Sequence, residues 1–125
     1  MIIELDFNSD KPIYTQLYEA IILAMASGEV TSGEPLPSVR NLASEIGINL
    51  HTVNKAYNQL RDEGYIIMDR RKGAIIGDIP IQDDSNKKNT IETDLTLILS
   101  KAKLLGYDEE YLTNLINEFY RKIGN

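Results

Sequence analysis

The fold is decided by residues 36–73, which read LPSVRNLASEIGINLHTVNKAYNQLRDEGYIIMDRRKG. Ser38 is predicted to cap a short helix and Gly47 to close it, because serine accepts N-terminal backbone N–H groups and glycine adopts the left-handed conformation. Asn49 is predicted to cap a second helix, which ends at Gly64. The predicted strands of a β-hairpin follow at Tyr65–Met68 and Ala74–Ile76. Two short helices, a tight turn and a hairpin with a basic tip form a winged helix-turn-helix, which lays its second helix in the DNA major groove.

The second helix exposes polar side chains at its N-terminal end. Its inward stripe is Val53, Ala56, Tyr57 and Leu60. His51, Thr52, Lys55 and Gln59 then face outward, and the first three lie at the start of the helix, where a recognition helix reaches base edges; Asn54 and Asn58 lie on the flank. A basic run at the hairpin tip predicts contacts to phosphate or to the minor groove. The residues predicted to contact double-stranded DNA are Ser38, Arg40, Asn49, His51, Thr52, Asn54, Lys55, Arg70, Arg71, Lys72 and Gly73.

The alternative for each of these side chains is an ordinary solvated surface position. Asn49 fits a helix cap better than a base reader, although a cap beside a phosphate does both. Tyr57 lies on the apolar stripe and is predicted to belong to the core rather than to bind phosphate.

A helix is also predicted before this motif. It opens at Asp10–Pro12, with proline at its first position, and ends at Gly28. Its apolar residues recur at three- and four-residue spacing, so one face is buried. The first seven residues alternate apolar and acidic side chains and predict a short strand.

The C-terminal third predicts two further helices. The segment Ile79–Thr90 is polar and is either a linker or the frayed start of a helix. Gly106 separates the two helices and Asp108 caps the second. About 35 residues are too few for an independent core, so the pair needs a partner. We expect a second copy of this hairpin, giving a homodimer; the alternative is that the pair folds back on its own N-terminal domain. The predicted dimerisation residues are Ile91, Leu95, Ile98, Leu99, Ala102, Leu112, Leu115, Ile116, Phe119 and Ile123.

The predicted architecture is therefore mainly α with a small β-wing (α+β). Residues 1–79 form the winged helix-turn-helix domain, and residues 80–125 form a linker and a two-helix dimerisation hairpin. The net charge of −6 is unusual for a DNA-binding protein. Residues 37–73, however, carry six basic and four acidic side chains, a local +2 that leaves −8 for the remainder.

Composition excludes several classes of function. With no cysteine and one histidine, the chain holds no disulfide, thiolate site or catalytic triad. No glycine-rich phosphate loop is present, and the acid clusters Asp83–Asp84 and Asp108–Glu110 lack convergent partners. We expect no enzyme activity, no cofactor and no metal. No signal peptide or membrane-spanning run is recognisable, so the expected location is the cytoplasm, in association with the nucleoid.

Several segments together resemble the GntR family of transcriptional regulators, and specifically its short YtrA-type subfamily. They are Pro12–Leu17, Gly28–Glu29, Leu36–Arg40, Asn49–Tyr57 and Leu60–Ile66. The resemblance implies a homodimer that represses transcription at a palindromic operator, and it implies a DNA contact for Arg40. YtrA-type genes often lie beside transporter operons, so control of such an operon is a further expectation.

Two segments depart from the family pattern. The wing tip, commonly Arg-x-Gly-x-Gly, keeps a single glycine at Gly73, so this bulkier tip is expected to enter the minor groove less deeply. The recognition helix opens Asn49-Leu50-His51-Thr52 where relatives often have Asn-Pro-Asn-Thr, so a different operator sequence is expected.

Two other functions stay open at this stage. One is a winged-helix module that binds a protein instead of DNA, consistent with the acidic total charge. The other is a transcriptional activator. Neither the effector, if one exists, nor the regulated genes follow from the sequence.

Overall fold

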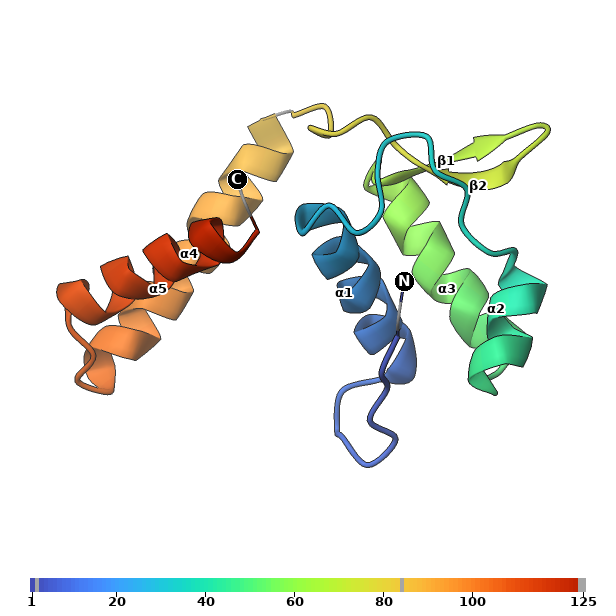
Figure 1. Cartoon of the computed structure of the whole chain (residues 1–125). Coiled ribbons are helices and arrows are strands. Elements are labelled where there is room, and N and C mark those ends of the chain that lie inside the picture. Colours follow the sequence, from blue (N-terminus) through green and yellow to red (C-terminus); the bar gives the residue numbers. More distant parts are fainter. Residues whose placement is uncertain (2, 84, 124–125) are drawn as a thin grey trace. The chain divides into compact units, whose positions relative to one another are not determined.

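A computed structural model describes residues 1, 3–83 and 85–123 (Figure 1). The chain divides into two compact units, Met1–Gln82 and Asp83–Asn125. The first unit contains α1 (Ile13–Ala26), α2 (Val39–Ile46), α3 (Leu50–Asp62), β1 (Ile66–Asp69) and β2 (Gly73–Ile76). The second contains α4 (Ser85–Leu104) and α5 (Glu109–Lys122). The chain is thus mainly helical with a small sheet, as the sequence predicts.

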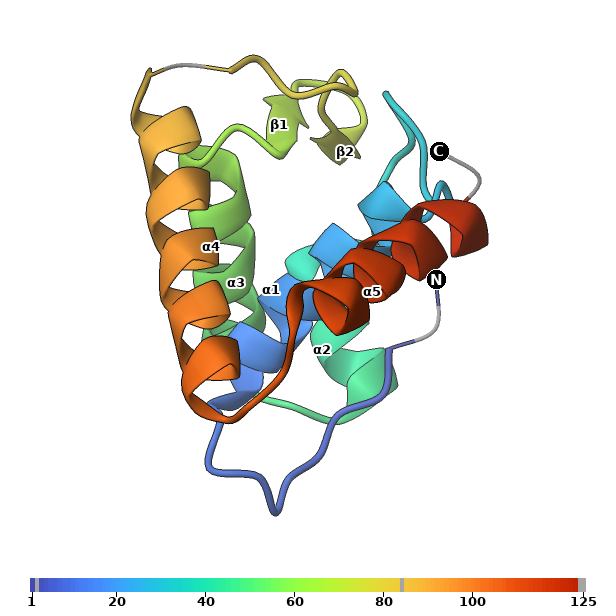
Figure 2. The same cartoon turned by 90° about the vertical axis from the view of Figure 1, so that its left-hand side faces the viewer.

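Helix α3 is the centre of the first unit, because both α1 and α2 pack against it and β1 follows directly from its end (Figures 1 and 2). The core lies between these elements and contains no buried polar or charged side chain among the described residues. Its fully buried large side chains are Leu17, Ile21, Val53, Leu60, Ile66 and Ile76.

The turn between α2 and α3 forms as predicted. Ser38 Oγ accepts a hydrogen bond from Asn41 N at 3.0 Å, which caps α2. Gly47 closes α2 at φ 77°, in the left-handed region where a side chain would be strained. Asn49 Oδ1 then accepts from His51 N at 2.7 Å and caps α3. These three residues fix the direction in which α3 leaves the turn.

The hairpin pairs β1 with β2 in antiparallel register, from Ile66 opposite Ile76 to Asp69 opposite Gly73. The segment before α2 lies along the other edge of β2, through a bridge between Pro35 and Ile75. The first strand begins one residue later than predicted, because Tyr65 N donates to Leu60 O at 2.8 Å and completes the C-cap of α3.

The strand predicted in the first seven residues is wrong for the described part of that segment, which has no regular structure. The side chain of Gln16 supplies the hydrogen bonds that a neighbouring strand would have made. Its Oε1 accepts from Asp6 N at 2.8 Å, and its Nε2 donates to Asp6 O at 3.0 Å. Ile2 lies outside the described residues.

The second unit consists of two helices that meet at Gly106 (Figure 2). Helix α4 already starts at Ser85, so the second half of the segment Ile79–Thr90 is helical, and Asp84 lies outside the described residues. Asp108 Oδ1 accepts from Tyr111 N at 2.9 Å and caps α5 as predicted. No described side chain of either helix is buried.

Candidate nucleic-acid interface

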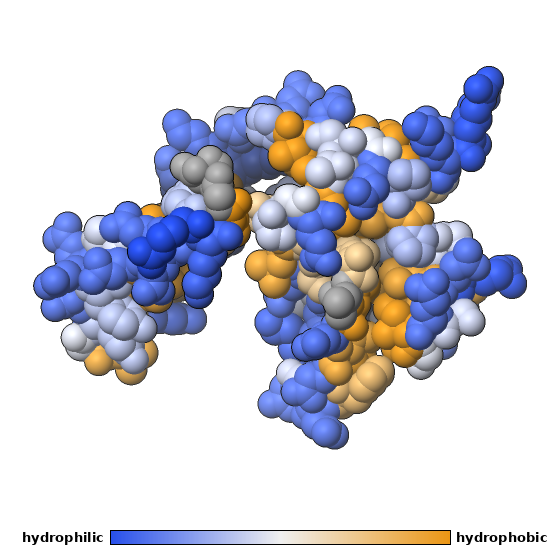
Figure 3. All heavy atoms as spheres, in the orientation of Figure 1, coloured by the Kyte–Doolittle hydropathy of each residue, from blue (hydrophilic) through white to orange (hydrophobic). Residues whose placement is uncertain are grey.

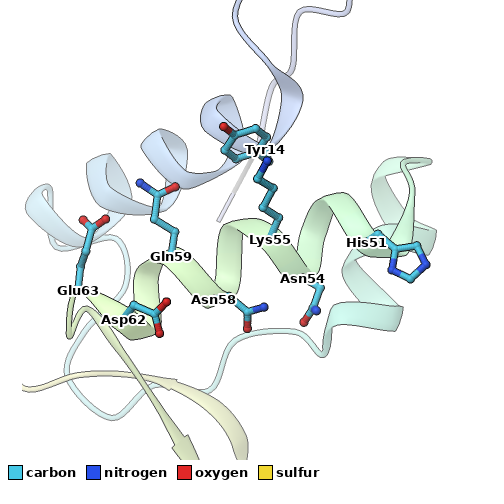
Figure 4. A pocket seen from close by; sticks show the side chains of 8 residues that line it. All are labelled: Tyr14, His51, Asn54, Lys55, Asn58, Gln59, Asp62 and Glu63. Atoms are coloured by element: carbon cyan, nitrogen blue, oxygen red, sulfur yellow. The ribbon is translucent and has the colours of Figure 1, made fainter.

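The exposed side of α3 carries two rows of polar side chains (Figure 4). One row points toward α1 and consists of Lys55, Gln59 and Glu63. The other points away from α1 and consists of Asn54, Asn58 and Asp62. Both rows follow the four-residue spacing of a helix. The sequence predicts that Thr52 and Gln59 face outward, but both side chains are half-buried. In the second row, Asn54 is exposed; Asn54 and Asn58 of this row are called the amide row below.

The N-terminal ends of both helices of the motif lie at this surface. Ser38 and Asn49 use their side chains as caps, as described above. Arg40, in the first turn of α2, is exposed and forms no ion pair with any described residue. His51 is exposed at the start of α3 (Figure 4). The remaining free N–H groups of a helix start favour an anion such as phosphate.

The wing tip is ordered by one carboxylate. Asp69 Oδ1 accepts from Arg71 N at 2.8 Å and from Lys72 N at 2.9 Å. The hydrogen bond from Lys72 N, and next that from Arg71 N, hold the pKa of the Asp69 carboxyl below its usual value. Gly73 closes the turn at φ 76°, so the one glycine retained in the tip stands where a left-handed residue is required. The three basic side chains of the tip, Arg70, Arg71 and Lys72, are all exposed, and Arg70 is the first residue of the turn.

A groove of about 200 Å³ lies between α3 and the wing. It brings together three residues of the predicted set, Ser38, Asn54 and Gly73. The other residues that line it were not in the predicted set: Val39, Tyr57, Asn58, Arg61, Met68 and Ala74. The four-residue step from Asn54 would have indicated Asn58, but no local pattern indicates Met68, whose place depends on how the hairpin folds over α3.

A second, shallow groove of about 550 Å³ runs along the exposed face of α3; both rows of side chains line it, and α1 contributes Tyr14 (Figure 4). Here Lys55 Nζ lies 3.9 Å from the centroid of the Tyr14 ring, within the range of a cation–π contact. Tyr14 belongs to α1 and was not predicted to take part in the site. His51 also lines this groove, whereas Thr52 lines neither of the two grooves described here.

Two tyrosine hydroxyls hold the elements that carry the site. Tyr57 Oη donates to Pro37 O at 2.7 Å and ties α3 to the residue before the α2 cap. Tyr18 Oη donates to Glu63 Oε1 and ties α1 to the end of α3. Burial raises the pKa of both hydroxyls above the usual tyrosine value, and for Tyr18 the Glu63 carboxylate adds to this effect. Tyr57 is a core residue, as the sequence predicts.

Comparison with known proteins identifies the chain. Residues 13–76, which span α1 to β2, match the model of the bacterial regulatory proteins of the gntR family. The HTH-type transcriptional repressor YtrA of Bacillus subtilis is 36% identical over 109 residues, covering 87% of this chain and 79% of that protein. The chain belongs to the GntR family. As a GntR protein it is a transcriptional regulator and not an enzyme.

Other relatives agree in sequence and in structure. The uncharacterized HTH-type regulator YhcF of Bacillus subtilis is 31% identical, with 90% of this chain and 93% of that protein covered. YtrA from Sulfolobus acidocaldarius, a GntR-family transcription factor, is 37% identical with a TM-score of 0.65, over 80% of this chain and 99% of that one. A transcriptional antiterminator from Listeria monocytogenes EGD-e is 29% identical with a TM-score of 0.88, over 98% and 92% of the two chains.

Two further observations concern the described residues as a whole. None of their helices combines the length and apolar character needed to cross a membrane. No group of three or more histidine or acidic side chains among them is arranged to hold a metal ion.

Proposed function

We propose that this GntR protein is a homodimer that represses transcription by binding a palindromic operator. The observation that carries the proposal is the make-up of the exposed side of α3. The amide side chains of Asn54 and Asn58 line the groove next to the wing, whose tip carries three cations. Amides read adenine edges in the major groove, and cations neutralise the phosphates beside it.

The mechanism is steric. Two recognition helices would enter successive major grooves, roughly 34 Å apart, and the bound dimer would exclude RNA polymerase. Each protomer contributes one DNA-binding unit, called its head. Within each head, backbone phosphates or groove edges would be contacted by Arg40, the cap residues and the wing. The row that contains Asn54 and Asn58 would read bases. An effector, if one exists, would act by binding two arrangements of the dimer with different affinity.

The proposed dimer interface is formed by α4 and α5. Large apolar side chains stay exposed on both helices, among them Ile98 at 59% and Phe119 at 46%. Apolar surface also appears where the two helices meet (Figure 3), and Leu104 is 86% exposed there. At about 100° per residue, Leu97 and Leu104 lie on the opposite side of α4 from the predicted stripe. One α5 helix does not cover two sides of α4, so a second copy of the pair is the partner we propose.

Light scattering on the full chain tests the dimer. Leu115→Glu places a charge on the apolar face of α5 and is expected to give a monomer at micromolar concentration. Asn117→Glu adds the same charge on the polar face of the same helix and is expected to leave the dimer intact. A monomeric unmodified chain at micromolar concentration would refute the proposed interface.

Binding to DNA from the protein's own upstream region tests the first half of the proposal. The affinity is expected to fall steeply with salt, because bound phosphates release counterions. Arg40→Ala is expected to weaken binding further, whereas Lys103→Ala, which removes a charge from the second unit, is the matched control. No binding at low salt, or indifference to both salt and Arg40→Ala, would favour the protein-interaction alternative.

Transcription in vitro from that upstream region separates the possible regulatory outcomes. A repressor lowers initiation and an activator raises it. One structural neighbour is described as an antiterminator, so the template should also carry a terminator; antitermination would raise read-through at constant initiation. Sequencing of the DNA fragments that the protein selects from its genome would give the operator and test the proposed control of a transporter operon.

A further inference from the structure

Lys55 projects from the recognition helix toward α1 and lines the shallow groove along α3 (Figure 4). Of the residues that line the groove there, it alone is a lysine or arginine. Its aromatic partner is Tyr14, at 3.9 Å from ammonium to ring centroid. Lys55 forms no ion pair with a described carboxylate. Its charge is therefore available to an anion from outside.

The two acidic residues at the end of the same helix are engaged elsewhere. Glu63 lies in the row of Lys55 but accepts a hydrogen bond from the Tyr18 hydroxyl. Asp62 lies in the other row and pairs with Arg61 at 3.4 Å. Neither acid neutralises Lys55, which explains why the lysine rests on an aromatic ring.

The stack also fixes the direction of the Lys55 side chain. It leaves α3 toward α1, whereas Asn54 and Asn58 leave α3 on the other side (Figure 4). A major groove has a phosphate backbone along each edge. The wing, with its three basic residues, is on the amide side of α3, so the α1 side has Lys55 as its cation.

We propose that Tyr14 is a positioning residue that holds Lys55 for a phosphate on the α1 side of the groove, and that Lys55 does not read bases. This inference rests on the proposed DNA binding. The ring orders a long flexible side chain before DNA arrives and so lowers the entropic cost of the contact. The ammonium has three donors, and those turned away from the ring remain free for phosphate oxygens. Base reading is then left to His51 and to the amide row.

The test uses five variants of the full chain: Tyr14→Phe, Tyr14→Leu, Lys55→Met, Lys55→Arg and the double variant Tyr14→Leu/Lys55→Met. Each is titrated against the upstream duplex and against a mixed-sequence duplex over a salt series. Tyr14→Phe keeps the ring and should bind within about two-fold of the unmodified protein. Tyr14→Leu should weaken binding of both duplexes by about 5- to 30-fold for a dimer, from a typical cation–π energy in each of two heads.

Lys55→Met should weaken both duplexes by similar factors and lower the slope of log K against log salt by about 2 for a dimer, one phosphate per head. Tyr14→Leu retains the charge and should leave most of the slope intact. Adding Tyr14→Leu to Lys55→Met should change nothing further. Lys55→Arg keeps both the stack and the charge and should bind within a few-fold of the unmodified protein.

Three results would overturn the inference. If Tyr14→Leu weakens the Lys55→Met protein as much as the unmodified one, Tyr14 acts through packing alone. If Lys55→Met weakens the upstream duplex but not the mixed one, Lys55 reads bases. If the Lys55 methylene protons of the DNA-free protein show no ring-current shift that Tyr14→Leu abolishes, the stack is absent; this measurement requires no DNA. Failure of the unmodified protein to bind either duplex is a different outcome, since it refutes the proposed function itself.

Discussion

Replacing Tyr57 by phenylalanine isolates one hydrogen bond at the base of the recognition helix. The ring is 4% exposed, and its hydroxyl donates to Pro37 O at 2.7 Å. Phenylalanine keeps the buried ring, so the loss is the hydrogen bond alone. A hydrogen bond of this kind contributes about 1 kcal/mol net, and leaving the acceptor without any partner raises the cost to roughly 2 kcal/mol. Pro37 is only half-buried, so the lower figure is expected.

Urea unfolding at fixed protein concentration measures this loss, because the stability of a dimer depends on concentration. The expected decrease of about 1 kcal/mol corresponds to roughly 4–8 °C in the melting temperature of a unit of this size. Tyr65→Phe is the matched control: Tyr65 is half-buried in the same unit, and its hydroxyl forms no hydrogen bond with a described residue. Equal stability of Tyr57→Phe and the unmodified protein, or an equal loss in Tyr65→Phe, would refute the role assigned to the Pro37 contact.

Three further predictions concern pH, the turn and the wing. Because burial raises the pKa of Tyr57 and Tyr18, the folded state keeps protons that the unfolded chain releases near pH 10. Urea unfolding should show constant stability from about pH 7 to about pH 10 and a decline above pH 10, and this decline should be shallower in Tyr57→Phe. Gly47→Ala should lower the free energy of unfolding by about 1–2 kcal/mol in the same assay, and Gly47→Asn should lower it less. Gly47 has φ 77° and nothing lies within 4 Å of the place that a Cβ would occupy, so backbone strain is the whole cost. Equal losses in the two variants would contradict this. Asp69→Ala should increase amide hydrogen exchange at the wing tip and weaken DNA binding. Asp69→Asn keeps the accepting oxygen and should leave both the exchange rates and the DNA affinity unchanged. Unchanged exchange in Asp69→Ala would refute the role of this carboxylate.

The sequence predicts local features of this fold well because their causes are local. Ser38, Asn49 and Asp108 cap helices through their own side chains, and the structure confirms all three. Gly47 closes α2 at a left-handed φ for the same reason. Each of these features depends on residues within four positions of one another, so a short stretch of sequence contains the necessary information.

Features that depend on contacts distant in sequence were missed. The first seven residues have the apolar–acidic alternation of a strand. A strand also needs a neighbouring strand to pair with, and here the side chain of Gln16 forms hydrogen bonds with the backbone of Asp6 instead. Tyr14 and Lys55 are 41 positions apart and meet because α1 packs on α3. No periodicity within α3 indicates that Lys55 turns toward α1 while Asn54 turns away from it.

The distribution of charge along α3 indicates which end of the helix faces DNA, and the net charge of the chain affects how tightly any DNA is bound. The N-terminal end of α3 offers His51, the amide of Asn54 and the positive end of the helix dipole, whereas its C-terminal end carries Asp62 and Glu63. Phosphates are therefore repelled from the C-terminal end, and we expect the helix to enter the groove from its N-terminal end up to about Asn58. The net charge of −6 opposes every DNA sequence equally, since it acts on phosphates that all sequences share. Contacts from amides to base edges are not screened in this way. An acidic body thus lowers non-specific affinity while leaving the base contacts of the operator intact, so the negative total charge is compatible with sequence-specific recognition.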